Sequence, residues 1–441
     1  MLEVVVKKSY IMLLLFAYSL FLSSGCAGKL TNPVLIDSNG VTQAQTSYKS
    51  VAPGEKLIET TSTYCVADIA SNSRYITVLQ SGINQKVIDL QSPWEVVPED
   101  QTLGMAFSPD SKLLAYNSES GLKVINLSSG DIARTVDISQ ARSFSFSHDG
   151  KHIAVAFPDN VGVYDFDTEK MLFKHATQDA SLISFSPDGE SVLVYNCNNM
   201  TFIPQLGWVG VGLYMAHSLG AFSDDCFRVF DWKSGKILHE YTAEDRCIYT
   251  IDFTPDGQFI VLGMTDDGIV TEGVIEVRDA HTGAIVFSWE VNPTLLGVAI
   301  SPDSKRLVAY FKQYKTPMQV FSLESGQMEQ EMACAGITTK ADFSEDGRYL
   351  GFTVMDAPIY GNGGVGLYDL ESKQLVYSSV FDWTAYDVGF LPDGSSMFIA
   401  GDGGVRMVPL QTLTPVDRHT ERKFMDTSSR QEGLTGCAVR P

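Results

Sequence analysis

The sequence has little positive charge. Its 441 residues include 32 Lys and Arg against 53 Asp and Glu, which gives a formal net charge of −21. A surface with this excess of negative charge repels phosphate backbones and anionic lipid headgroups. The composition therefore argues against nucleic acid as a partner and against electrostatic adhesion to a membrane.

The chain also lacks the motifs of common enzymes. It has no P-loop, Gly-x-Ser-x-Gly, His-Glu-x-x-His or Cys-x-x-Cys-His motif, and its seven histidines are scattered without metal-ligand spacing. Residues 361–366 (GNGGVG) match the dinucleotide fingerprint, but a strand-like run follows them instead of a phosphate-binding helix N-terminus. Asp266 and Asp267 could touch a cation, although acidic loop residues in so acidic a chain are usually solvated. We predict no catalytic residues, no metal site and no cofactor.

The chain does contain a ten-residue motif that recurs. Seven copies are 107–116 (FSPDSKLLAY), 146–155, 185–194, 253–262, 300–309, 343–352 and 390–399, and a degenerate eighth copy spans 69–79. In each copy an apolar strand meets a Pro-Asp-Gly-type turn and a second apolar run leaves it, as in a β-hairpin. The copies start 38, 39, 39, 68, 47, 43 and 47 residues apart. A period of about 40 residues is typical of a β-propeller.

A second pattern follows most copies, at the end of another strand. It is an aromatic-Asp pair in the clearest cases, Tyr164-Asp165, Phe230-Asp231 and Tyr368-Asp369. The arrangement resembles the WD-type β-propeller, whose blades have four strands, a to d, with such a pair closing strand c. The copies mostly lack the Gly-His and Trp-Asp signatures, so the resemblance is to divergent bacterial propellers, and it covers residues 54–415.

Eight turns predict an all-β fold, an eight-bladed β-propeller of four-stranded antiparallel blades. A seven-bladed ring with one copy outside it, or a β-sandwich, is the alternative.

The first 25 residues have the features of a secretory signal peptide. Lys7 and Lys8 precede an apolar run at 11–22, and small residues lead to Cys26. This ending resembles a bacterial lipobox, although Ser23 stands where that pattern prefers Leu; the alternative is an ordinary secretory signal. The resemblance implies lipidation at Cys26. Ala27, in place of an inner-membrane retention Asp, points to an exported cell-envelope lipoprotein of the outer membrane that faces the periplasm. We expect residues 26–53 to be a flexible tether and 416–441 a C-terminal tail.

The extra length of the longer repeats is expected in the loop between strands b and c. The distance from the turn to the second pattern is 16 residues in the shortest repeats and 43 in the longest, and the excess falls on blades four to seven. All such loops emerge on one rim, where function tends to reside.

The largest insertion, 198–225, contains an uncharged run that either folds over the propeller mouth or forms an exposed patch for a partner. The candidate partner-binding residues are Phe202, Trp208, Leu213, Tyr214 and Phe222.

Two cysteines bracket this insertion, and we predict a disulfide between them. Cys197 ends strand b and Cys226 starts strand c, and neighbouring antiparallel strands bring such positions within reach. The alternative is two buried thiols. Cys65, Cys247, Cys334 and Cys437 are not assigned to pairs.

The chain ends are predicted to close the ring together. Residues 54–69 align with 235–253, so 56–61 should be an outer strand, and the vacancy for it is in blade eight, whose strands a to c come from 386–410. In the alternative, 411–419 turns back as the fourth strand of blade eight, although Pro415 suits only an edge strand.

Two classes of function fit this organisation. The first is a non-catalytic protein-binding or scaffold propeller of the bacterial cell envelope, bound to the membrane through its N-terminal lipid and to envelope proteins through the face over blades four to seven. The alternative is a propeller enzyme, such as a lactonase or a quinoprotein-like dehydrogenase, with its site in the central channel. We expect the first.

Overall fold

The computed structural model describes residues 48–49, 56–58, 64–80, 84–91, 95–96, 105–118, 121–136, 138, 141–177, 180–196, 225–243, 246–266, 273–292, 295–311, 318–334, 336–355, 363–381, 383–402, 404–413 and 437–439. In this part of the chain the regular structure consists of β-strands and one 3₁₀ turn, η1 (Leu410–Thr412). No helix in it is long and apolar enough to cross a membrane.

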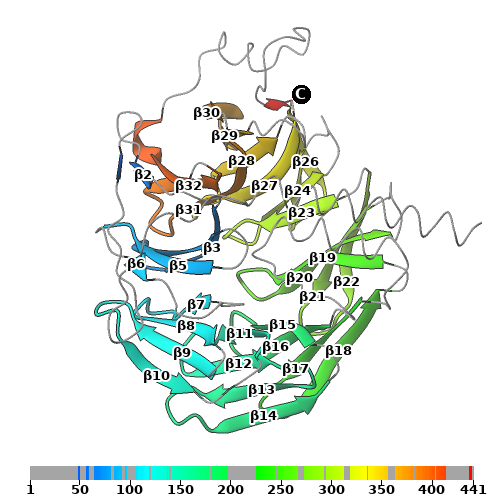
Figure 1. Cartoon of the computed structure of the whole chain (residues 1–441). Coiled ribbons are helices and arrows are strands. Elements are labelled where there is room, and N and C mark those ends of the chain that lie inside the picture. Colours follow the sequence, from blue (N-terminus) through cyan, green and yellow to red (C-terminus); the bar gives the residue numbers. More distant parts are fainter. Residues whose placement is uncertain are drawn as a thin grey trace, which may run out of the picture.

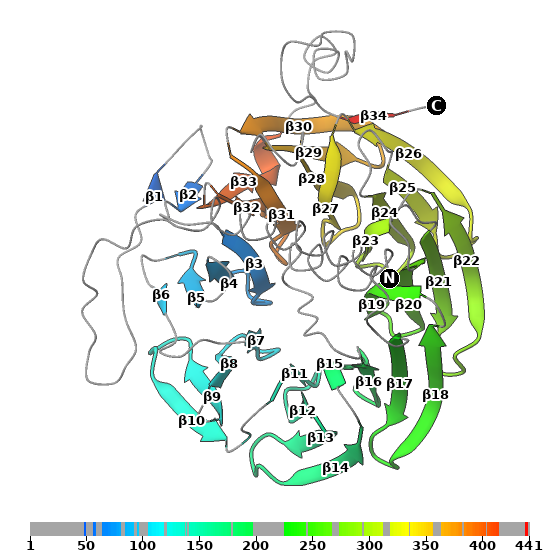
Figure 2. The same cartoon turned by 45° about the vertical axis from the view of Figure 1, so that its right-hand side comes forward.

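The strands form eight antiparallel sheets that follow one another around a ring (Figure 2). The first four blades are β3 (Tyr64–Ile69), β4 (Tyr75–Gln80), β5 (Asn84–Asp89) and β6 (Glu95–Val96); β7 (Met105–Phe107), β8 (Leu113–Ser118), β9 (Gly121–Asn126) and β10 (Ile132–Val136); β11 (Ser143–Phe146), β12 (His152–Ala156), β13 (Asn160–Asp165) and β14 (Met171–Ala176); and β15 (Ala180–Phe185), β16 (Ser191–Asn196), β17 (Asp225–Asp231) and β18 (Lys236–Ala243).

The other four blades continue the same order from strand a to strand d. They are β19 (Arg246–Phe253), β20 (Phe259–Asp266), β21 (Gly273–Asp279) and β22 (Ile285–Val291); β23 (Leu295–Ile300), β24 (Arg306–Phe311), β25 (Met318–Ser322) and β26 (Met328–Cys334); β27 (Ile337–Phe343), β28 (Tyr349–Met355), β29 (Gly363–Asp369) and β30 (Gln374–Phe381); and β31 (Ala385–Phe390), β32 (Ser396–Gly401) and β33 (Gly404–Pro409). Strand a of each blade lies nearest the centre of the ring (Figure 2).

The prediction of eight four-stranded blades is confirmed. The degenerate copy at 69–79 belongs to a full four-stranded blade. Ile76 and Val78 of this blade pack against Phe398 and Met407 of blade eight. On its other side the same blade packs through Val87 against blade two. Blade one therefore occupies a place in the ring, which excludes both the seven-bladed ring and the β-sandwich.

The hydrophobic core is divided among the seams between blades. Eight clusters of buried side chains each join two neighbouring blades. Strands in the middle of a blade are therefore covered on both faces, and every residue of β29 is buried. This explains why the second half of each repeat is a nearly continuous apolar run and not an alternating one.

The glycine-rich sequence at 361–366 enters strand β29, as expected. A Cβ on Gly366 would overlap the ring of Phe352, a side chain with only 1% of its surface exposed. A Cβ on Gly363 would likewise overlap the backbone of Trp383 and Ala385, where the chain enters the next blade. These glycines allow close packing between strands and blades, so the literal match to a dinucleotide fingerprint has a structural cause.

The recurring turn is held by a Ser or Thr and an Asp. In six blades the hydroxyl donates to the Asp two residues later, as Ser147 Oγ does to Asp149 Oδ1 at 2.7 Å. The Asp then accepts a backbone N–H, here that of Lys151 at 3.0 Å. The side chains thus satisfy the backbone groups that the turn leaves unpaired.

The fourth position of the turn has a positive φ whether it is Gly or Ser. The angle is 69° at Gly150, and it is 56°, 55° and 57° at Ser73, Ser111 and Ser304. Such a conformation is strained for residues other than Gly. Each of these serines accepts a backbone N–H from the turn of the preceding blade, from Asp393, Asn72 and Asp256 respectively. These bonds link neighbouring blades, and the bond at Ser73 links blade eight to blade one.

The N-terminal segment closes the ring. Strand β2 (Lys56–Ile58) pairs antiparallel with β33, in the register Lys56 to Met407 and Ile58 to Val405. The prediction that this segment supplies the outer strand of blade eight is confirmed. The alternative is wrong in its described part, because residues 410–412 form η1 and not a strand. Strand β1 (Tyr48–Lys49), from the segment expected to be a tether, adds a fifth strand next to β2.

The other end of the chain also adds a strand. Strand β34 (Cys437–Val439), within the expected C-terminal tail, pairs antiparallel with β26 on the outside of blade six. It lies at the outer rim of the ring (red in Figures 1 and 2). The sequence analysis expected no strand here.

Candidate interaction face and central channel

The longer repeats have their extra length between strands b and c, as predicted. The segments between these strands are 197–224, 267–272, 312–317 and 356–362 in blades four to seven, against 81–83, 119–120, 157–159 and 402–403 in the others. Because every blade has the same strand order, these connections and those from strand d to the next strand a leave the ring on one side. We call this side the loop face, and the opposite side, which carries the Ser-Asp turns, the turn face.

The residues predicted to bind a partner lie outside the described part of the chain. This holds for Phe202, Trp208, Leu213, Tyr214 and Phe222, and also for Cys26. Their roles stay predictions.

The predicted disulfide is not shown. Cys197 lies outside the described residues, so the structure describes no bond between it and Cys226. The register places Asn196 directly opposite Cys226. Since successive side chains of a strand point to opposite faces, this register does not by itself bring the two sulfurs together. The pairing stays a prediction.

On the loop face, the described residues form an aromatic cluster at the seam of blades seven and eight. Phe381 ends strand d of blade seven, and Trp383 lies in the connection to blade eight. Their rings stack with centroids 4.3 Å apart and an interplanar angle of 15°. The guanidinium of Arg406, from strand c of blade eight, lies 4.8 Å from the Phe381 ring and 6.0 Å from the Trp383 ring. Both contacts fall within the usual range of a cation–π interaction.

Polar groups extend this cluster toward the mouth of the channel. The Tyr386 hydroxyl donates to Asp402 Oδ2 at 3.0 Å, and the N–H of Asp402 donates to the carbonyl of Thr384 at 3.1 Å. Asp402 is exposed, whereas Trp383 and Tyr386 are half-buried. A fixed Trp, Tyr and Arg with partly accessible surfaces are the side chains most enriched in the centres of protein interfaces. We call Phe381, Trp383, Tyr386, Asp402 and Arg406 the loop-face cluster.

The sequence analysis missed this cluster. Its members come from a strand end, two connections and a neighbouring blade, and no spacing in the sequence relates them. The signal that could have located it was the pair of aromatic residues in 381–383 (FDW) just before a strand a.

The central channel contains carboxylates that the sequence analysis also missed. Strand a is the inner edge of every blade, so part of its backbone N–H groups face the axis of the ring. Asp252, Asp342 and Asp387 each accept the N–H of the following residue, at 2.8 to 2.9 Å. An acidic residue directly before the repeat, as in Asp252-Phe253, was the available signal.

The environment of the channel raises the pKa of two of these acids. Burial raises the pKa of Asp252 to about 6 against the opposing effect of the Phe253 N–H. Burial likewise raises the pKa of Asp342 to about 6; Lys340 opposes this shift, and Asp387 adds to it. Asp252 is exposed, whereas Asp342 is half-buried.

A buried tyrosine adjoins Asp342. Burial raises the pKa of Tyr310, and the charges of Lys340, Asp387 and Asp342 also act on it. The Tyr310 hydroxyl lies over Gly297, where a Cβ would overlap it. Blades six, seven and eight thus place a phenol, an ammonium and two carboxyl groups close together at the channel.

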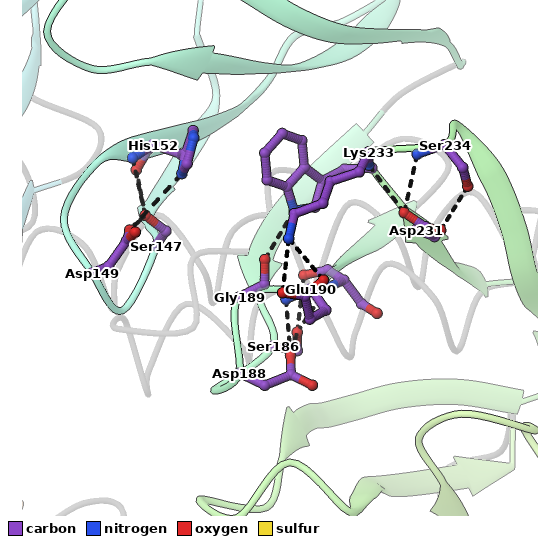
Figure 3. A network of polar contacts seen from close by, with 12 residues as sticks. Ser147, Asp149, His152, Ser186, Asp188, Gly189, Glu190, Asp231, Lys233 and Ser234 are labelled. Atoms are coloured by element: carbon purple, nitrogen blue, oxygen red, sulfur yellow. Dashed lines mark hydrogen bonds and ion pairs between the residues drawn. The ribbon is translucent and has the colours of Figure 1, made fainter.

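On the turn face, polar contacts within blade three and within blade four lie close together (Figure 3), and a ring contact between His152 and Trp232 joins the two blades. Trp232 Nε1 donates to the carbonyl of Gly189 at 2.9 Å, and the ring of His152 lies 4.9 Å from the Trp232 ring. Ser147 Oγ bonds Asp149 and accepts the backbone N–H of His152 at 2.9 Å. The Ser, His and Asp of this turn are thus arranged to hold the backbone, and not as the nucleophile, base and orienting acid of a triad.

Comparison with protein families gives one match. The model of the WD domain, G-beta repeat, matches residues 235–271, which cover β18, β19, β20 and most of the connection that follows β20. Among curated proteins, the apoptotic protease-activating factor 1 of Danio rerio is 24% identical over 262 residues, which is 55% of this chain and 18% of that protein. The chain thus spans less than one fifth of the relative that it matches.

Solved structures share the fold. The C-terminal WD40 domain of Sif2 superimposes with a TM-score of 0.56 at 12% identity, over 86% of this chain and 99% of that chain. A hydrazine synthase of Kuenenia stuttgartiensis gives a TM-score of 0.47 at 16% identity, over 70% of this chain and 95% of that chain. The likeness to the Sif2 domain, at 12% identity, concerns the fold alone.

Proposed function

We propose that this WD40-like β-propeller is a non-catalytic scaffold of the bacterial cell envelope that holds a protein partner on its loop face. The observation that carries the proposal is the coincidence of two features on that face. The strands that flank the long connections of blades four to seven end there, and the loop-face cluster lies against Gly363, the first residue of β29.

The geometry of the cluster suits protein binding. Gly363, the first residue of β29 after the insertion of blade seven, lies against the Trp383 backbone, so this end of β29 adjoins the cluster. The stacked rings and the guanidinium are held in place before a partner arrives, which lowers the conformational entropy lost on binding. Repeated blades then provide the rigid support on which such loops act.

The membrane part of the proposal rests on the sequence. Lipidation at Cys26 and a polar tether would hold the propeller at the outer membrane, facing the periplasm. A lipid anchor, and not charge, would make this attachment, because the chain has a formal net charge of −21. Acyl labelling of the wild type and of Cys26→Ala, with fractionation of the membranes, tests it; a wild-type protein without acyl label would refute it.

The binding surface is tested by capture from native envelope membranes, followed by a titration with the purified partner. The intact protein is compared with Trp383→Ala and with a variant in which residues 198–224 are replaced by a short Gly-Ser linker. Loss of a Trp at the centre of an interface costs about 2 kcal/mol or more, which weakens binding about 30-fold. Lys233→Ala, on the turn face, is the matched control and should bind like the wild type.

Two results would reject the proposed surface. One is unchanged affinity in both loop-face variants while each keeps the wild-type unfolding midpoint. The other is a loss of binding in the turn-face control that equals the loss in Trp383→Ala.

The enzyme alternative has one observation in its favour. Asp342, with its pKa raised to about 6, lies near Lys340 and Tyr310 in the channel, and perturbed groups of this kind cluster at functional sites. The hydrogen bond from the Phe343 N–H also gives Asp342 a structural role. The two functions separate in one variant: Asp342→Asn should keep full partner binding if the protein is a scaffold.

A further inference from the structure

Two cysteines occupy opposite positions where the C-terminal strand β34 pairs with β26. Strand β34 pairs with β26 in the register Met332 to Val439, Ala333 to Ala438 and Cys334 to Cys437. The two residues come from positions 103 apart in the chain and belong to a blade and to the tail beyond the ring. No feature of the sequence singles out this pair from the other possible pairs.

We propose that Cys334 and Cys437 form a disulfide that fastens the C-terminal segment to the outer edge of blade six. Directly opposed residues of an antiparallel pair have Cα atoms about 4.5 or 5.5 Å apart, depending on whether they are a hydrogen-bonded pair. Both spacings lie within the range of about 4.4 to 6.8 Å that a disulfide spans. The register therefore satisfies the distance requirement in either case.

The cross-link would act on the closure of the ring. Residues 335–436, which lie between the two cysteines, contain blade seven and strands a to c of blade eight. A covalent loop from blade six to the tail keeps these blades in place even when the pairing of β2 with β33 opens. It also covers the exposed edge of β26, which could otherwise accept a strand from another protein.

The reaction requires a disulfide-bearing oxidant, such as oxidised glutathione. One cysteine thiolate attacks a sulfur of the oxidant, forms a mixed disulfide and expels one glutathione thiolate. The second cysteine thiolate then attacks the mixed disulfide and expels the other. The protein loses two protons and two electrons and gains one S–S bond, and the oxidant is reduced to two thiols.

Peptide mapping of the full chain tests the pair. The folded protein is treated with oxidised glutathione, alkylated, digested with trypsin and analysed without reduction. Trypsin gives the peptides 316–340 and 431–441, each of which contains one cysteine, because it does not cleave the Arg440–Pro441 bond. We expect them as a single cross-linked species that separates on reduction. Recovery of both peptides alkylated and separate, or of 431–441 joined to another cysteine, would overturn the proposal.

A register-shifted variant controls for unspecific oxidation. Cys437→Ala combined with Val439→Cys moves the thiol from a position opposite Cys334 to one opposite Met332. This variant keeps one cysteine in the peptide 431–441, and its cross-link to 316–340 should be lost. An equal yield from the shifted variant would show that the register is not the cause of the pairing, and would also overturn the proposal. The test uses purified protein and does not depend on the scaffold function.

Discussion

Removal of the N-terminal strands should weaken the ring at a single seam. A truncation that deletes residues 27–61 removes β1 and β2 and leaves β33 as an exposed edge. The pairing of β2 with β33 covers three residue pairs, which supply about three backbone hydrogen bonds. At about 1 kcal/mol each, their loss costs about 3 kcal/mol, a large part of the usual stability of about 5 to 15 kcal/mol.

The assay is equilibrium unfolding in urea, followed by tryptophan fluorescence. With a slope of about 3 kcal/mol/M, a loss of about 3 kcal/mol lowers the midpoint by about 1 M. A shorter truncation that deletes only residues 27–47, before β1, is the matched control and should unfold like the wild type.

A synthetic peptide of residues 45–61 gives the second arm of this experiment. Added to the longer truncation it should take the vacant place beside β33, and at 100 times its Kd it should restore about 2.7 kcal/mol. An unchanged midpoint in the longer truncation would refute the reasoning, because the ring would then close without β2. A loss that the peptide cannot restore would instead show that the deletion harms folding by another route.

Three further predictions concern single side chains. Arg348→Ala removes the guanidinium that binds the buried carboxylate of Asp369 at 2.8 Å, so urea unfolding should show a loss of about 1 to 3 kcal/mol, against less than about 0.5 kcal/mol for Lys112→Ala in an exposed pair. The pKa of Asp342 is about 6 in the folded protein and about 3.9 in the unfolded chain, so wild-type stability falls as the pH rises from about 3.9 through 6. Asp342→Asn removes this loss, and in urea unfolding it should therefore stabilise the protein by about 1 kcal/mol at pH 8 and by nothing below about pH 4. Ser304→Ala should lower Tm more than Ser304→Gly, because both lose the 3.0 Å bond from the Asp256 N–H but only Gly relieves the strain of a φ of 57°; the opposite order would show that the strain is negligible.

The blade count could be predicted because each turn has a chemical signature. In six blades a Ser or Thr and an Asp satisfy the same backbone groups of the turn, and a Gly or Ser takes the positive φ at its fourth position, so the pattern survives even where the strands differ. The place of β2 was also predictable, since an eight-bladed ring whose last blade has three strands leaves one vacancy. The turn serines show the limit of this approach: the sequence marks Ser111 as a variant of Gly, but its bond to the neighbouring blade depends on the closed ring.

The candidate site was less predictable for a physical reason. The loop-face cluster joins residues from the ends of strands in two blades, and their contacts depend on how neighbouring sheets are angled. The pairing of β34 with β26 has the same character, because three residues at 437–439 carry no periodic signal that could assign them to a sheet. Side chains that act across a seam can be assigned only when the seam is known.

The two faces of the ring differ in how their polar groups are used, and this difference bears on function. On the turn face, Ser147 and Asp149 bond to backbone groups of their own turn, and Trp232 bonds the backbone of the neighbouring strand connection. These side chains have their hydrogen-bonding capacity committed to the fold, so substitutions there should act first on stability. On the loop face the connections differ in length from blade to blade. The Trp383 ring is held there by stacking on Phe381, whereas the Trp232 ring is held by a hydrogen bond to a backbone carbonyl. A substitution such as Trp383→Ala should therefore change partner affinity more than it changes the unfolding midpoint, whereas Trp232→Ala should do the reverse.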